Sequence, residues 1–289
     1  MLTVGIIGKT KIREHLDLLK TVVDFLKKER KEIYFDKNTA EFVTKKEGLT
    51  RAELLKKVDI AVILGGDGTI LKTARSMSYK KVLIFGVNLG RLGFLTEGAP
   101  ENILKDLKKI FIDQKFRLDN RALLRVTVYR KGKKVMTSLA LNEVVINQGS
   151  FARLIDLRTE INQRKIAHFR ADGLIIATPT GSTGHSLSAG GPIVHYDLDG
   201  LIMTPICPAS LANRSIVIPN DRQIKIILDT KRKDEDLKQI GLTLDGQESF
   251  QLTADDEIRI RKSGRVFSFI RFGTPQYYRI LRKKLKWGI

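Results

Sequence analysis

The sequence predicts an α/β domain with a parallel sheet, followed by a β-rich domain. Through its first third, short apolar runs rich in β-branched residues alternate with amphipathic helical patterns. That alternation is typical of a parallel sheet whose ligand-binding loops follow the strands. From residue 122 onward, strand patterns separated by turn signals follow one another. We therefore expect domains at residues 1–115 and 116–273, with a last helix at 274–289 that packs back on the first domain.

The first domain is expected to hold four strands, at residues 2–8, 32–35, 58–64 and 82–87. The expected helices lie at residues 12–30 and 50–57 and in a segment that follows Pro100. Thr50 and Glu53 have the spacing of a capping box, a reciprocal pair of hydrogen bonds at a helix N-terminus.

The second domain is expected to consist mainly of strands. They are predicted at residues 123–129, 135–141, 143–147, 154–161, 173–177, 215–219, 224–228, 240–244, 257–261 and 266–271. Residues 277–287 read as a basic helix. A membrane-surface helix is conceivable, but we favour a helix with a solvated Lys/Arg face.

Composition restricts the class of protein. The 289 residues have a formal charge of +20, which suits nucleic acid, an anionic membrane or anionic small ligands. We find no zinc-finger spacing, recognition-helix pattern or aromatic-interleaved basic repeat, and no apolar run of membrane-spanning length. We expect neither nucleic acid nor a membrane as partner. Cys207 is the only cysteine, which excludes an intramolecular disulfide, and the expected location is the cytoplasm.

Residues 61–71 organise the chain. A buried-strand pattern stops at Gly65, Gly66, Asp67, Gly68 and Thr69, and apolar residues then resume at helical spacing. Glycines let a ligand approach the backbone closely, and a helix N-terminus offers N–H groups to phosphate. The turn is therefore predicted to hold a nucleotide. Lys72, about one turn into the helix, could meet a donor phosphate or be solvated.

Asp67 is the unusual residue of this turn. A carboxylate among phosphates repels the ligand unless it binds a metal or takes a proton. The alternative is that Asp67 only caps a helix that begins near Thr69. The Walker lysine and the Rossmann glycine spacing are both missing.

A second informative stretch covers residues 178–192 and is rich in hydroxyl-bearing and small residues. Ser182 or Thr183 could cap a short helix there. A strand pattern leads into the stretch and Pro192 closes it, so we favour a rigid binding loop over a flexible linker.

Three acidic positions lie next to strand patterns: Asn142-Glu143, Asp172-Gly173 and Asp245-Gly246-Gln247. Each alone would be an ordinary turn, and a plain hairpin is the simplest interpretation of the last. His185 lies in the hydroxyl-rich stretch, whereas His15, His168 and His195 lack metal-ligand spacing, so structural zinc is not expected.

With these motifs in this order, the sequence resembles the NAD kinase family, which phosphorylates the adenosine ribose 2′-hydroxyl of NAD. The resemblance spans nearly the whole chain. It implies a Rossmann-like N-terminal domain, a β-sandwich-like C-terminal domain and an active site between them. It further implies Mg²⁺, or another divalent metal, carried by the donor phosphates, ATP or polyphosphate as donor, and a homodimer or homotetramer.

The resemblance also implies residue roles. Asp67 would be the base that takes the hydroxyl proton, and Asn142 and Glu143 would hold the adenosine ribose. The other positions that it assigns to the NAD pocket are Gly68, Arg153, Arg170, Asp172, Thr183, Gly184, His185, Ser186, Leu187, Ser188 and Gln247. The phosphate-donor loop would comprise Gly65, Gly66, Gly68, Thr69 and Lys72.

Two departures from the family pattern stand out. Many relatives carry Ala-Tyr where this chain has Gly184-His185, and a histidine two residues after a proline where this chain has Pro208-Ala209-Ser210. We expect activity with an altered affinity or an altered preference between NAD and NADH. The competing interpretations are a lipid kinase of the diacylglycerol or sphingosine type, which shares the glycine turn, and a nonenzymatic nucleotide sensor or nucleic-acid-binding protein.

Overall fold

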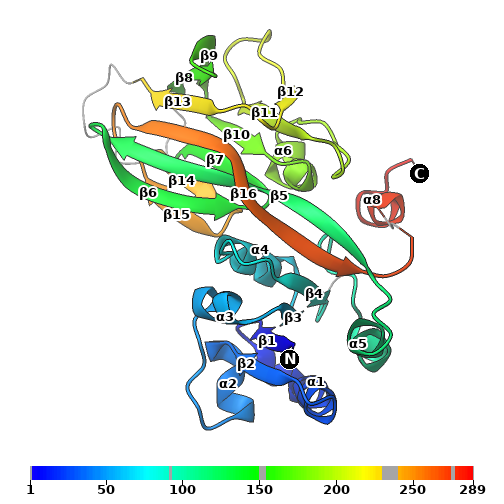
Figure 1. Cartoon of the computed structure of the whole chain (residues 1–289). Helices are drawn as coiled ribbons and strands as arrows, with labels where there is room; N and C mark the ends of the chain where they lie inside the picture. Colours follow the sequence, from blue (N-terminus) through cyan, green and yellow to red (C-terminus); the bar gives the residue numbers. More distant parts are fainter. Residues whose placement is uncertain (1, 91–92, 150–153, 230–239, 275–276, 289) are drawn as a thin grey trace. The chain divides into compact units, whose positions relative to one another are not determined.

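The computed structural model describes residues 2–90, 93–149, 154–229, 240–274 and 277–288 (Figure 1). The chain forms two compact units. Unit 1 comprises Met1–Asn120 and Phe267–Ile289, and unit 2 comprises Arg121–Val266. Strands β5 (Arg117–Arg130) and β16 (Glu257–Arg271) carry the chain from one unit into the other.

Unit 1 contains the predicted parallel sheet. Its strands are β1 (Thr3–Gly8), β2 (Glu32–Phe35), β3 (Ile60–Leu64) and β4 (Leu83–Val87), in the order β2-β1-β3-β4. The end of β16 pairs in parallel with β4. Every residue of β3 is buried, as expected for a central strand that is covered on both faces.

Unit 1 also contains helices. They are α1 (Leu16–Lys28), α2 (Lys37–Val43), α3 (Arg51–Lys57), α4 (Asp67–Arg75), α5 (Ile103–Phe111) and α8 (Tyr277–Leu285), with 3₁₀ turns at Ile12–His15 and Pro100–Asn102. Leu19 and Val22 of α1 pack with Leu107 and Ile110 of α5 in one buried cluster with the sheet. The Thr50–Glu53 capping box is present at α3, as predicted. None of the helices within the described residues is both long and apolar enough to span a bilayer.

Unit 2 is a sandwich of antiparallel strands. One sheet has the order β12-β11-β10-β7-β14-β15, and the opposing strands are β5, β6, β8, β9, β13 and β16. Their bounds are β6 Lys133–Ala140, β7 Glu143–Gln148, β8 Ile155–Ile161, β9 Arg164–Ala171, β10 Gly173–Ala177, β11 Gly200–Ile206, β12 Ile216–Pro219, β13 Ile224–Leu228, β14 Ile240–Leu244 and β15 Glu248–Gln251. Side chains from both layers share one apolar core.

The fold class is confirmed, and the structure corrects several elements. Helix α2 and strands β9, β11 and β15 were not predicted. The predicted strands at 257–261 and 266–271 are one continuous strand, β16, because Ser263-Gly264 does not turn the chain. Strand β5 begins at Arg117, earlier than the apolar pattern indicates.

Candidate functional site

The glycine turn joins β3 to α4. Gly66 is the N-cap residue and α4 begins at Asp67, two residues before the predicted start. Gly65 is required by space, because an added Cβ would lie 2.4 Å from Thr69 Oγ1. The turn therefore presents a helix N-terminus, with its partial positive charge, directly after a buried strand.

Asp67 does not cap the helix that it begins. Its Oδ2 accepts a hydrogen bond from the Phe94 N–H at 2.8 Å, and its Oδ1 accepts one from the Leu95 N–H at 3.2 Å. Gly93 makes this approach possible, since a Cβ there would lie 1.9 Å from Asp67 Oδ1. The loop after β4 thus fixes the carboxylate of the turn after β3, a relation that the sequence patterns did not indicate.

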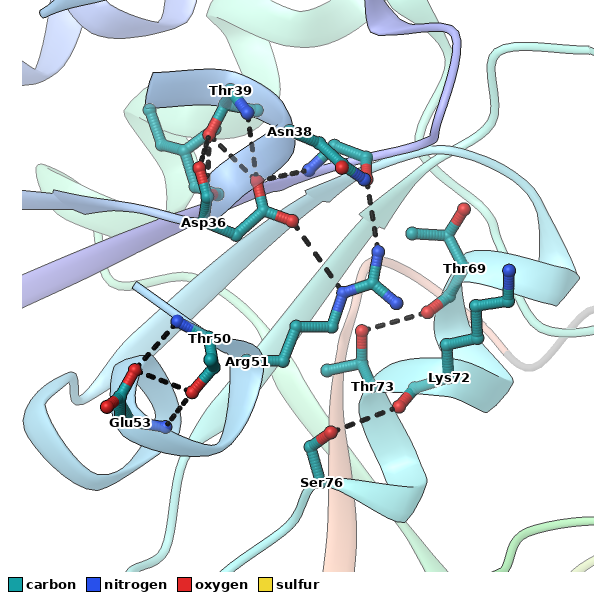
Figure 2. Close-up of polar contacts among 12 residues, drawn as sticks. Asp36, Asn38, Thr39, Thr50, Arg51, Glu53, Thr69, Lys72, Thr73 and Ser76 are labelled. Atoms are coloured by element: carbon teal, nitrogen blue, oxygen red, sulfur yellow. Dashed lines mark hydrogen bonds and ion pairs between the residues drawn. The ribbon is translucent and has the colours of Figure 1, made fainter. Parts of the chain in front are cut away.

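The other residues of the turn differ in exposure. Gly68 and Lys72 are exposed, whereas Thr69 is buried. The Thr69 carbonyl accepts a hydrogen bond from Thr73 Oγ1 at 2.8 Å, as Figure 2 shows. Lys72 is therefore accessible to a ligand from solvent, whereas the buried Thr69 stabilises the turn.

A polar cluster that sequence reasoning missed lies where β1 and β2 end (Figure 2). Asp36 is buried and accepts hydrogen bonds from the N–H groups of Thr39 and Gly8. Arg51 Nε lies 3.6 Å from Asp36 Oδ2, and Nη2 donates to the Gly8 carbonyl. Burial raises the pKa of Asp36, and the bonds from Thr39 and Gly8 and the charge of Arg51 oppose that rise. The cluster anchors the strand ends of unit 1.

In unit 2, the hydroxyl-rich loop leaves β10 and is tightly bonded. It forms a 3₁₀ turn at Thr180–Thr183 and then α6 (His185–Ser188). The expected caps are wrong, because Pro179 and Gly184 occupy the N-cap positions. Ser182 Oγ instead donates to the Pro179 carbonyl at 2.7 Å and accepts from the Val194 N–H at 3.1 Å. These bonds are those of a rigid loop, as the sequence predicts.

Asn142 and Glu143 lie where β7 begins. The Asp245 carboxylate accepts the N–H groups of Leu141, Asn142 and Glu143 at 3.1, 2.8 and 3.2 Å. Asp245 is buried, with φ of 51°. The interpretation of Asp245 as a plain hairpin residue therefore misses its contact with β7, because its partners are remote in sequence.

Glu143 is paired with His185 of α6. Their Oε1 and Nδ1 atoms are 2.8 Å apart, and the Glu143 side chain is 2% exposed. Burial raises the pKa of Glu143 to about 7, the hydrogen bond from His185 opposes the rise, and the charge of Asp245 adds to it. Glu143 Oε2 and Asn142 Oδ1 are buried without a hydrogen-bond partner in the described part of the chain. Such acceptors suit hydroxyl groups of a ligand.

Gly184 leaves room for this pair, since an added Cβ would lie 2.7 Å from Glu143 Oε2. The neighbouring predicted residues have mixed roles. Ser186 is buried and bonded to Thr204, Leu187 and Thr183 are half-buried, and Ser188 is exposed. Gln247 is exposed on the turn that contains Gly246, and an added Cβ on Gly246 would lie 3.1 Å from His185 Cε1.

Two predicted residues lie at the other end of β10. Asp172 directly precedes Gly173, whereas Ala177 at the opposite end pairs with Glu143. Arg170, the second of the two, is exposed on β9. At about 3.3 Å per residue, the length of β10 separates both from Glu143. Arg153 lies outside the described residues.

Two family models match the chain. The model of the ATP-NAD kinase N-terminal domain matches residues 4–115, and that of the ATP-NAD kinase C-terminal domain matches residues 141–272. The NAD kinase of Geotalea daltonii is 44% identical over 238 residues, 82% of each chain. The NAD kinase of Syntrophotalea carbinolica is 39% identical over 289 residues, 100% of this chain and 99% of the relative.

Solved structures also match. The crystal structure of an NAD kinase from Archaeoglobus fulgidus in complex with ATP has a TM-score of 0.72 at 28% identity and covers 99% of both chains. Yeast NADH kinase complexed with NADH has a TM-score of 0.89 over 100% of this chain and 88% of that chain. At 23% identity, the yeast match shows the shared fold alone.

Proposed function

Because this chain belongs to the NAD kinase family, we propose that it transfers the terminal phosphoryl group of ATP to the adenosine ribose 2′-hydroxyl of NAD, giving NADP. The observation that best supports the proposal is the position of the Asp67 carboxylate. It is a carboxylate at a helix N-terminus within a glycine turn, and two backbone N–H groups hold it in place.

Asp67 acts as the general base. A ribose hydroxyl is a poor nucleophile near neutral pH, and a positioned carboxylate that accepts its proton contributes roughly 10²- to 10⁴-fold. Each carboxylate oxygen accepts one N–H and keeps a lone pair for the incoming proton. The bonds from Phe94 and Leu95 orient the carboxylate before the substrate arrives, which favours a productive geometry.

The donor phosphates are assigned to Gly65, Gly66, Gly68, Thr69 and Lys72. The described residues contain no group of three or more His, Cys, Asp or Glu side chains that could hold a metal. Mg²⁺ commonly binds through substrate phosphates, one or two carboxylates and water, so the residues present fit an ion that the donor carries, with Asp67 as the nearby carboxylate. Bound there, the ion would neutralise charge that develops on the transferred group.

The NAD-binding roles stay as the resemblance assigns them. Asn142 and Glu143 hold the adenosine ribose, and their buried unpartnered oxygens support this assignment. Residues 183–188, Arg170, Asp172 and Gln247 would line the rest of the pocket, together with Arg153. Polyphosphate stays a possible donor, to be compared directly with ATP. We further propose a homodimer or homotetramer in the cytoplasm, and light scattering of the purified protein would measure the subunit number.

The test is Asp67→Asn. Purified protein is incubated with Mg²⁺, NAD and ATP or polyphosphate, and NADP is followed with an NADP-specific dehydrogenase. We expect turnover to fall roughly 10²- to 10⁴-fold while NAD binding is retained. Asp17→Asn is the matched control, because it also removes a carboxylate from the first turn of a helix in unit 1. The proposal would be overturned if the wild type formed no NADP, or if Asp67→Asn turned over as fast as the wild type.

A further inference from the structure

Glu143 and His185 form a pair of unequal exposure. The Glu143 side chain is 2% exposed and the His185 side chain is 60% exposed, with Nδ1 held 2.8 Å from Oε1. Within the described residues, His185 Nε2 makes no hydrogen bond to the protein. One ring nitrogen is therefore fixed by a buried carboxylate, and the other is left for a ligand.

The turn after β14 lies beside the His185 ring. Gly246 has φ of 63°, and an added Cβ would lie 3.1 Å from His185 Cε1 and 3.8 Å from Nε2. Asp245, one residue earlier, is tied to the backbone of β7. The imidazole therefore has Glu143 at Nδ1 and the Gly246 turn close to Cε1.

We propose that Glu143 and His185 bind one proton as a unit, and that the protonated pair donates a hydrogen bond from His185 Nε2 to an anionic oxygen of the bound dinucleotide. This inference rests on the proposed function, because NAD is the ligand. An imidazolium donates from both nitrogens, so Nδ1 can serve Glu143 while Nε2 serves the ligand. Hydrogen bonds from a charged donor to phosphate oxygen are about twice as strong as neutral ones.

The surroundings place this proton in the neutral pH range. The charged groups that face Glu143 are His185 from α6 and Asp245 from the turn after β14. Burial and Asp245 favour a bound proton, which is why the pKa of Glu143 rises to about 7. Above that pH the pair starts without its proton, so NAD binding must take one up, and affinity must fall as pH rises.

The experiment measures proton uptake directly. NAD is titrated calorimetrically into the full chain at pH 6, 7 and 8, in buffers of different ionisation enthalpy. For wild type we expect uptake that approaches one proton at pH 8 and an affinity that falls by up to about tenfold per pH unit above pH 7. His185→Phe keeps a ring and removes both nitrogens, so its uptake should be close to zero.

Two further variants distinguish the loss of the Nε2 hydrogen bond from a change in the fold. His185→Asn keeps a donor for Glu143 but has nothing at the place of Nε2, so it should retain the fold and lose the uptake. His168→Phe is the matched control, since His168 lies on β9 with its side chain 48% exposed and 3.6 Å from Asp156. It should behave like wild type.

The outcomes distinguish this inference from the proposed function. Equal proton uptake in wild type and both His185 variants would overturn the role of the pair, even if NADP is formed. Proton uptake that depends on His185, in a protein that binds NAD but forms no NADP, would support the pair and overturn the kinase reaction.

Discussion

At the scale of a single residue, the buried Glu143 carboxylate lowers the stability of the fold at alkaline pH. Its pKa is about 7 in the fold against 4.5 in the unfolded chain, so the native state holds the proton more tightly. The associated stability is fully present below pH 4.5 and is lost as pH rises through 7. A difference of this size corresponds to about 3 kcal/mol in the free energy of unfolding.

Glu143→Gln should therefore stabilise the protein at alkaline pH. The amide has nearly the same shape and no charge to bury, so the variant should exceed wild type by up to about 3 kcal/mol at pH 8.5 and match it near pH 4.5. Urea unfolding at both pH values measures the difference. Glu47→Gln, at a side chain that is 90% exposed, is the control. A variant less stable than wild type at pH 8.5 would show that the carboxylate is needed by the fold itself.

At the scale of elements, the loop after β4 determines where the carboxylate of α4 lies. An added Cβ at Gly93 would lie 1.9 Å from Asp67 Oδ1, so Gly93→Ala must displace the base or the loop. A shift of about 1 Å at a catalytic group can cost about 10²-fold, and we expect turnover to fall by roughly 10- to 100-fold. The comparison is Gly90→Ala in the same loop, where an added Cβ meets nothing within 4 Å. Equal turnover of the two variants would contradict the positioning role.

The same elements explain what the sequence could predict. The turn between β3 and α4 was predictable because an all-apolar strand and three glycines are local signals. Strand β9 was missed because its first three residues are all exposed and only Phe169 and Ala171 are buried, so the alternation of a half-buried strand covers only its last few residues. Asp67 held by Phe94 and Leu95, and Asp245 held against β7, depend on residues far apart in the sequence. Patterns within one segment cannot reveal such contacts.

At the scale of the whole molecule, the relevant quantity is the excess of positive charge. Lys and Arg number 52 against 32 Asp and Glu, which gives the formal charge of +20. Among the candidate site residues only Lys72, Arg153 and Arg170 are lysine or arginine, so most of the excess lies elsewhere in the chain. Its general effect is to raise the local concentration of anionic ligands and their rate of encounter.

Affinity for the donor should therefore depend on ionic strength in proportion to donor charge. Raising salt from 0.01 to 0.15 M shortens the Debye length from about 30 to about 8 Å, so kcat/KM for ATP should fall by roughly tenfold. The fall for NAD, which carries less charge, should be smaller, and binding of uncharged adenosine should hardly change. Turnover at saturating substrate should stay constant, because screening acts on encounter rather than on the positioned carboxylate of Asp67. If salt weakened the binding of adenosine and of ATP equally, it would be acting on the fold. The excess charge would then have no part in attracting the donor.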